Sequence, residues 1–337
     1  MNIKNAAPIA NDSTNFTRLI LGILKEEGMK AALFSDGWII QITHKKQVRY
    51  IHGYQFGLNL AASANLCNDK SSCSEILTAC NIPNVPHYCF MSPLDMRYAS
   101  PQGNWNALFS LFSKYGSVIC KNNDGTGGEE VYHARTQLEL EHYSQRIFST
   151  CPSMAVSPYY PIDSEYRLIL LDGEVCLAYE KIRPCLTGDG HSSVWELYIR
   201  YLSDTRPYQA YQTFLPPEDA DHILKTGETY LLNWKHNLGQ GAAAQILYDR
   251  TGHIKNDIDD DRRFLLDSLS VLAKKAAAAT GVRFASIDLV KINGESGFRV
   301  LEINSGVMME YLSGAGKASH QIAKSIYREA IYKMFEV

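Results

Sequence analysis

The stretch that decides the fold is FASIDLVKI-NGESG-FRVLEIN, residues 284–304. Two runs rich in β-branched and aromatic residues, separated by a short turn with two glycines, predict a β-hairpin. Side chains alternate along a strand, so Glu302 and Asn304 face the same way, and the hairpin brings Asp288 beside them. Carboxylate and amide oxygens on a rigid sheet suit a hard divalent ion such as Mg²⁺. The alternative is that Glu302 is an ordinary charged residue on a solvated strand face.

A glycine-rich loop, NNDGTGGEE, follows the predicted strand SVICK. Lys121 ends that strand, and the loop contains Gly125, Thr126, Gly127 and Gly128. Glycines let backbone N–H groups converge on an anion, and the lysine adds positive charge, so this segment suits phosphate groups. The alternative is a flexible hairpin loop. The loop is not a Walker A motif, and the chain holds no G-x-G-x-x-G dinucleotide motif.

Charged residues also mark the predicted hairpin YRLILL-DG-EVCLAYEKI. Asp-Gly between alternating apolar residues is a strong hairpin signal. Glu165 and Arg167 share one strand face at its start, and Lys181 and Arg183 share one at its end. Paired strands could gather all four around one cleft, or the four could form a cross-strand ladder of ion pairs.

Two further polar segments are candidates for anion binding. Lys70, in NDKSSCSEIL, lies at the start of a predicted helix, where a cation and the helix N-terminus both favour an anion; a solvated lysine is the alternative. The segment NWKHNLGQGA contains Lys235, His236 and Asn237 among glycines. It is either a polar surface turn or a strip of donors that holds a phosphorylated intermediate.

Periodicity and turn signals predict an alternation of helices and strands along the whole chain. A loop is expected at 184–192. The helices are predicted near 16–27, 58–67, 70–81, 104–115, 136–148, from 194, 259–280 and from 317. The strands are predicted at AALFS, WIIQITH, VRYIHGY, SVICK, a run after the glycine loop, SMAVS, and the two hairpins.

Composition excludes several classes of protein. The chain has 337 residues with 45% hydrophobic and 20% charged residues, which rules out a disordered, collagen-like or coiled-coil chain. A formal net charge of −3 gives no general attraction to nucleic acid or to an anionic membrane. We predict neither a signal peptide nor a membrane span. The eight cysteines form no C-x-x-C pair and are expected to be reduced, small buried residues in the cytoplasm.

The order of these motifs is more informative than any one of them. A lysine before a helix, a strand–Lys–glycine loop, EKIRPCLTGDGHSSVWEL, KHNLGQGA and finally SIDLV…VLEINSG follow one another. This order resembles the ATP-grasp superfamily of carboxylate–amine ligases over residues 65–337, and most resembles cyanophycin synthetase and the ligase domain of bifunctional glutathione synthetase. The resemblance implies an α+β / α/β fold in which two α+β lobes clamp ATP, preceded by a small α/β lobe. We expect these lobes at residues 91–160 (glycine loop), 161–337 (metal) and 1–90.

The resemblance also implies a role for each candidate residue. The catalytic set, facing the γ-phosphate and acyl phosphate, would be Arg183, Lys235, His236 and Asn237, with His236 acting on a tetrahedral intermediate. The metal ligands, for two Mg²⁺ ions or Mn²⁺ as a substitute, would be Asp288, Glu302 and Asn304. The ATP-binding set would be Lys70, Lys121, Gly125, Thr126, Gly127, Gly128, the adenine hinge Ser157, Pro158, Tyr159 and Tyr160, the ribose-binding Glu165, and Lys181.

The activity implied is formation of an amide bond between a small carboxylate and an amine, through an acyl phosphate, with ADP and phosphate released. The carboxylate would belong to an amino acid or small peptide. Two alternatives remain: a small-molecule kinase that uses the same nucleotide machinery, and a non-catalytic nucleotide-binding protein. We expect small-molecule partners, no nucleic acid and no membrane, and leave a homodimer open.

Overall fold

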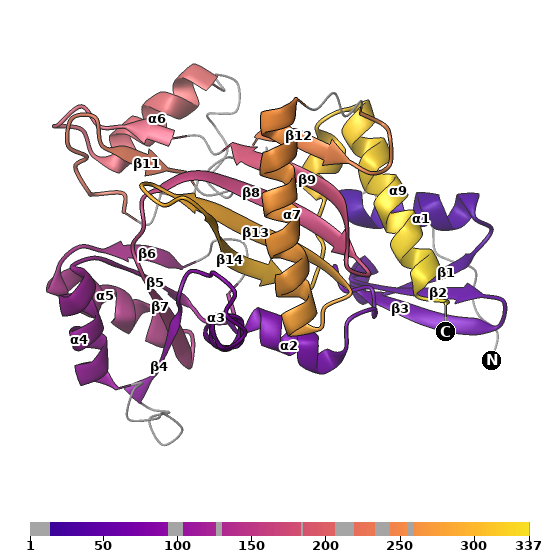
Figure 1. The fold of residues 1–337 in the computed structure, drawn as a ribbon, viewed down its shortest axis with the longest axis horizontal. Coiled ribbons are helices and arrows are strands. Elements are labelled where there is room, and N and C mark those ends of the chain that lie inside the picture. The colour runs from indigo at the N-terminus through magenta and orange to yellow at the C-terminus, as the bar shows by residue number, and fades with distance from the viewer. Residues whose placement is uncertain are drawn as a thin grey trace.

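Antiparallel sheets form the framework of the protein (Figure 1). In the computed structural model, the described residues are 14–93, 104–125, 130–182, 185–205, 219–232, 243–254 and 259–336. Their sheets contain five, four, three and two strands. Among these residues, none of the helices has both the length and the apolar content of a bilayer-crossing segment.

The largest sheet has the strand order β12-β9-β8-β13-β14, with every neighbouring pair antiparallel. Both predicted hairpins lie in it. The turn between β8 and β9 is Asp172-Gly173, with φ angles of 50° and 78°, as the tight Asp-Gly hairpin turn requires. The strands are β8 (Ile162–Leu171), β9 (Glu174–Ile182), β12 (Ala243–Asp249), β13 (Phe284–Ile292) and β14 (Phe298–Asn304).

One face of this sheet is apolar and is covered by the long helix α7 (Asp260–Thr280), which crosses it in Figure 1. Leu168 from β8 and Leu289 from β13 point to this face and share a core with Leu269 and Ala276 of the helix. The helices α2 (Ala61–Asn68) and α3 (Lys70–Ala79) pack beside α7 and β14.

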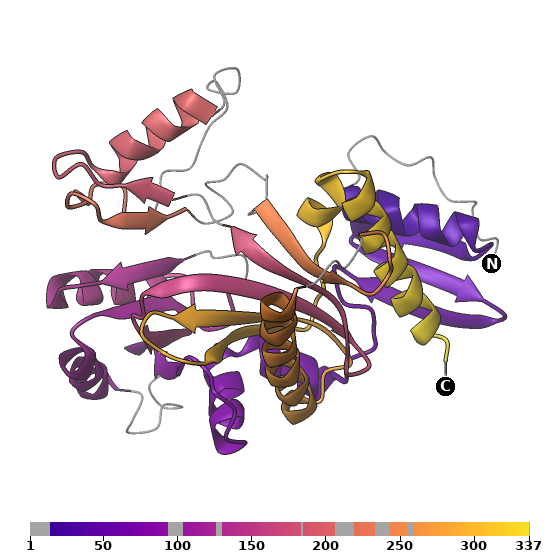
Figure 2. The same ribbon diagram turned by 45° about the horizontal axis from the view of Figure 1, so that its top comes forward.

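On the opposite face, the largest apolar area lies at the end near the chain termini. There Ile169, Leu177 and Phe284 share a core with the first and last segments of the chain. The first and last helices lie side by side (Figures 1 and 2), and Phe56 stacks on Tyr327 with ring centroids 5.4 Å apart. These segments contain α1 (Asn15–Glu26), β1 (Lys30–Phe34), β2 (Ile39–His44), β3 (Gln47–His52), α8 (Glu310–Gly314) and α9 (Lys317–Lys333).

The four-stranded sheet has the order β4-β7-β5-β6 and packs against two helices. Their start points follow from their caps: Asn104 accepts a hydrogen bond from Ala107 N, and Thr136 and Glu139 form a reciprocal capping box. The elements are β4 (Tyr88–Met91), α4 (Trp105–Tyr115), β5 (Val118–Asn122), β6 (Val131–Ala134), α5 (Gln137–Phe148) and β7 (Ser153–Pro158).

A small unit with its own core completes the described fold. It consists of β10 (Cys185–Thr187), α6 (Val194–Thr205) and β11 (Thr229–Leu231). In Figure 2 it lies above the four-stranded sheet. The link between the two is the buried Asp219, which accepts a hydrogen bond from Tyr143 of α5 at 3.0 Å.

The structure corrects several predicted boundaries. The loop expected at 184–192 contains the strand β10, because three-residue strands are too short to show a periodicity. The helix expected at 58–67 begins at Ala61, because the Asn59 side chain bonds to four backbone groups of 283–284 and 305 and keeps the segment non-helical. The strand β12 and the short helix α8 were not predicted. The lobe boundaries at 90 and 160 stay predictions.

Leu140→Ala and Leu138→Ala remove the same atoms from the same helix, α5. Leu140 is fully buried, whereas Leu138 is 76% exposed. In urea unfolding we expect Leu140→Ala to lower the free energy of unfolding by about 2–5 kcal/mol. Leu138→Ala should change it by less than about 0.5 kcal/mol. Equal losses for both variants would contradict the packing of α5 described above.

Candidate active site

The end of the five-stranded sheet face that the terminal segments leave uncovered carries charged side chains. Asp288 on the central strand β13 lies opposite Arg167 of β8 on one side and Glu302 of β14 on the other. Residues paired across strands point to the same face, and so do residues two apart along a strand. The register therefore gathers Glu165, Arg167, Lys181, Asp288 and Glu302 on one face.

Asp288 is the centre of this charged face. Its side chain is 2% exposed, and Arg167 donates two parallel hydrogen bonds of 2.6 Å to its two oxygens. Lys181 Nζ lies 3.2 Å from Asp288 Oδ2 and also donates to Glu165. Burial alone would raise the pKa of Asp288, but the charges of Arg167 and Lys181 outweigh it and hold the pKa well below the usual range. Of the four residues for which the sequence left a cross-strand ladder open, Glu165 and Lys181 pair directly and Arg167 joins them through Asp288, whereas Arg183 lies outside the described residues.

The predicted metal ligands meet the needs of Mg²⁺ unequally. Glu302 is 28% exposed and lies 3.5 Å from the Lys70 ammonium, and the Asn304 amide nitrogen is buried with no hydrogen-bond partner in the described structure. Glu302 fits a hard cation, because its carboxylate is partly exposed and the Lys70 ammonium is 3.5 Å away. The unpartnered atom of Asn304 is a donor and suits an anion, so only its amide oxygen is of the kind that binds Mg²⁺. Asp288 fits less well, since two cations already engage both of its oxygens. No group of three or more His, Cys, Asp and Glu side chains within the described ranges could hold a metal ion.

Lys70 joins this face to the glycine-rich loop. It is the first residue of α3, whose N-cap is the Asp69 carboxylate bonded to Ser72 N at 2.8 Å. Its ammonium donates to the Gly125 carbonyl and lies 3.5 Å from Glu302. The side chain is 9% exposed, which excludes a solvated surface lysine. Lys70 therefore bridges the start of the loop and strand β14.

Asn123 links the glycine-rich loop to the start of α3. It was not among the predicted site residues. It is 2% exposed; its side-chain oxygen accepts a hydrogen bond from Ser71 N at 3.1 Å, and its carbonyl accepts one from Lys70 N at 3.2 Å. These bonds satisfy N–H groups in the first turn of α3. In the sequence, Asn123 is only one polar residue of the glycine-rich loop, and no local pattern indicates its bonds to α3.

Lys121 lies on β5, as predicted, at the entrance to the same loop. Its positive charge and that of Lys70 both act on the buried ring of His87. The two predicted phosphate lysines, on different elements, thus both lie near His87. His87 was not predicted, because an isolated histidine carries no local signal.

The predicted adenine hinge is the end of β7 and the residues after it. Ser157 is buried, whereas Tyr159 is 45% exposed and stacks on His133 with ring centroids 4.0 Å apart. His133 Nε2 lies 2.5 Å from Ser117 Oγ. Burial, and then the charge of Arg135, lower the pKa of His133 to about 3. Pro158 is the last residue of β7, and the Tyr160 ring lies under the guanidinium of Arg299 at 5.2 Å.

Several predicted residues lie outside the described part of the chain. They are the catalytic candidates Arg183, Lys235, His236 and Asn237, and the loop residues Thr126, Gly127 and Gly128. Their roles stay predictions.

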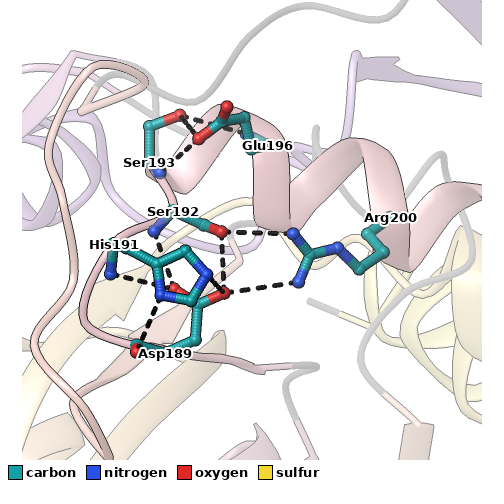
Figure 3. A network of polar contacts seen from close by, with 6 residues as sticks. All are labelled: Asp189, His191, Ser192, Ser193, Glu196 and Arg200. Atoms are coloured by element: carbon teal, nitrogen blue, oxygen red, sulfur yellow. Dashed lines mark hydrogen bonds and ion pairs between the residues drawn. The ribbon is translucent and has the colours of Figure 1, made fainter.

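The segment GDGHSSVWEL forms a tightly bonded loop leading into α6 (Figure 3). Arg200 donates to Ser192 Oγ at 3.1 Å and to Asp189 at 3.4 Å, while the Asp189 carboxylate also accepts from the Ser192 hydroxyl. The Ser192 hydroxyl and backbone N–H groups lower the pKa of Asp189. A Cβ at Gly188 would lie 2.2 Å from the Lys225 carbonyl, so only glycine fits there.

No protein-family model matches the chain, and no curated protein matches it either. Solved structures do match. A bifunctional glutathione synthetase from Pasteurella multocida is 15% identical, with a TM-score of 0.50 over 94% of this chain. This chain spans less than half of that protein, 44% of its length.

The chain has the ATP-grasp fold. The predicted fold class is thereby confirmed. Two other matches have lower TM-scores. The D-alanine–D-alanine ligase from Bacillus anthracis is 14% identical, with a TM-score of 0.48 over 82% of this chain and 68% of its own. D-Cycloserine synthetase DcsG is 15% identical, with a TM-score of 0.45 over 79% and 71%.

Arg167→Met tests whether the buried Asp288 carboxylate needs its paired cations for the stability of the folded chain. The variant leaves a buried carboxylate with one of its two cations, and we expect it to lower the free energy of unfolding by about 3–5 kcal/mol. Arg283→Met is the matched control, because Arg283 pairs with the more exposed Asp172 at 2.7 Å. That change should cost no more than about 1 kcal/mol. Similar losses in urea unfolding would contradict the role assigned to Asp288.

The pH dependence of stability tests the burial of His133. Its pKa is about 3 in the folded chain and about 6.5 when unfolded, so between these pH values only the unfolded chain binds the proton. Stability contributed by the neutral ring is therefore complete above pH ~6.5 and falls as the pH drops toward 3. We therefore expect the free energy of unfolding of His133→Gln, measured from pH 8 to 4, to lack the part of the pH dependence that comes from this ring. The exposed His142→Gln should retain it, and identical pH profiles for wild type and His133→Gln would refute the assignment.

Proposed function

We propose that the protein is an ATP-dependent ligase that joins a carboxylate to an amine and releases ADP and phosphate. The observation that carries the proposal is Lys70, which links the glycine loop at Gly125 to Glu302 on the charged sheet face. Gly125, at the start of the loop that we propose for phosphates, and Glu302, whose oxygens suit a hard cation, both contact this lysine within the ATP-grasp fold.

The nucleotide would lie between the four-stranded and five-stranded sheets. Lys70 and Lys121 would neutralise phosphate charge, and the loop from Gly125 to Gly128 would cover the β- and γ-phosphates. The segment Ser157–Tyr160 would contact adenine, with the exposed ring of Tyr159 already held against His133. Glu165 would bind the ribose only after sharing or releasing Lys181, since the two now bond to each other.

Glu302 and Asn304 would hold Mg²⁺, and Asp288 would contribute by sharing its oxygens with Arg167 and Lys181. When bound, the metal would neutralise charge on the transferring phosphoryl group. The buried Asn304 amide nitrogen, which has no partner among the described residues, is a donor and would be satisfied by a phosphate oxygen of the nucleotide, while the amide oxygen would face the metal.

The chemistry follows from positioning and charge neutralisation. The substrate carboxylate attacks the γ-phosphorus of ATP, which breaks the bond to ADP and forms an acyl phosphate. The amine then attacks the acyl carbon, phosphate leaves, and the amine loses a proton. Arg183, Lys235 and Asn237 are proposed to stabilise the charged groups, and His236 to act on the tetrahedral intermediate. The proposed carboxylate is that of an amino acid or small peptide.

ADP release across pairs of carboxylates and amines, with mass spectrometry of the products, tests this function. We expect turnover that needs ATP, Mg²⁺, one carboxylate and one amine together. Glu302→Gln should lower it by at least about 100-fold, because a metal ligand matters at least as much as the residues that support ligands.

Glu295→Gln is the matched control. Glu295 lies in the turn of the same hairpin, where it pairs with Arg299 at 2.8 Å on the surface. It should keep wild-type activity. ADP release that Glu302→Gln leaves unchanged, or product formation without an amine, would overturn the proposed ligase.

A further inference from the structure

One buried nitrogen near the charged face has no partner in the described structure. His87 is 7% exposed, and its Nε2 atom is buried without a hydrogen bond. The ring donates an N–H toward the Val85 carbonyl. Because Nε2 is unbonded, the donor is Nδ1, and Nε2 carries a bare lone pair. A buried acceptor of this kind is rare in proteins and calls for a ligand or a water.

His87 is fixed by contacts that do not involve Nε2. Its backbone N–H donates to Ser74 Oγ of α3 at 3.0 Å, and that hydroxyl in turn donates to Asn84 at 2.7 Å. The segment before β4 is thereby tied to the helix that starts at Lys70. Burial, together with the charges of Lys121 and Lys70, holds the pKa of His87 well below its usual value. The ring is therefore neutral, and Nε2 is an acceptor.

A small cavity adjoins this ring. Its volume is about 10 Å³, and His87, Lys70, Glu302, Cys67 and Cys73 all line it. That volume is about the space one water molecule needs, and a buried water needs two to four polar partners. The lining supplies an acceptor at His87, an acceptor at Glu302 and a donor at Lys70. The side chains thus match the two hydrogens and the lone pairs of one water.

We propose that one ordered water occupies this cavity, donates hydrogen bonds to His87 Nε2 and Glu302, and accepts one from Lys70. His87 is then a positioning residue: through the water it fixes the carboxylate and the ammonium that flank the glycine loop. The water satisfies the orphan nitrogen and gives Glu302 a second partner besides the lysine 3.5 Å away. The consequence for nucleotide binding rests on the proposed function, whereas the water site itself does not.

Two substitutions distinguish the roles of the two ring nitrogens of His87. His87→Asn keeps an N–H near the Nδ1 position and removes the acceptor at Nε2. His87→Gln places an amide oxygen near Nε2 and so restores the acceptor. Leu77→Val is the matched control, because Leu77 lines the same cavity with apolar atoms only.

Calorimetric titration with Mg²⁺ and a non-hydrolysable ATP analogue gives the functional readout. We expect His87→Asn to weaken binding by about 10-fold or more, as loss of a residue that supports a ligand does. His87→Gln should recover affinity to within about three-fold of wild type, and Leu77→Val should bind like wild type. Equal losses for the asparagine and glutamine variants, or a loss for Leu77→Val as large as for His87→Asn, would overturn the positioning role.

A second readout needs no nucleotide. The ¹⁵N spectrum of the histidine rings should show His87 as the Nδ1–H tautomer with a hydrogen-bonded Nε2, and a crystal structure should show the water. A free Nε2 or an empty cavity would overturn the proposal. If the water is present and wild type fails to bind the Mg²⁺–nucleotide, the proposed function fails while the water site stands.

Discussion

The buried carboxylate of Asp288 is the constraint on which the site depends. A charge that is 2% exposed on the central strand is stable only with cations beside it, and Arg167 and Lys181 supply them from the next two strands. Lys181 in turn holds Glu165, so this part of the sheet face is polar. The other end can be apolar and receive the first and last helices, and the reverse face packs against α7 and the helices α2 and α3 beside it.

The second organising contact is the corner at Lys70, where three parts of the chain meet. The helix α3 brings the lysine, the loop after β5 brings Asn123 and Gly125, and β14 brings Glu302. Each of these segments forms through contacts between residues close in sequence. Hydrogen bonds between residues more than 50 positions apart then join the helix to the loop. The fold thus places Gly125, at the start of the proposed phosphate loop, near Glu302, the proposed metal ligand, through their shared contact with Lys70.

The sequence predicted the local features of this arrangement and not the long-range pairings. Asn104 and Thr136 cap helices where expected, and Asp172-Gly173 makes the expected hairpin turn. Which charge meets which depends on strand register: Arg167 and Asp288 are 121 residues apart, so a cleft and an ion-pair ladder were both open. The strand β12 was missed because its alanine-rich start has low β-propensity. His87 was missed because its role comes from burial and neighbours, which no local pattern contains.

The most direct test of the account is a crystal structure of the protein with Mg²⁺ and a non-hydrolysable ATP analogue. The account predicts the triphosphate between the glycine loop and the charged sheet face, within contact of Lys70, with metal density on Glu302 and Asn304. Nucleotide bound elsewhere, or a metal that touches neither Glu302 nor Asn304, would contradict it.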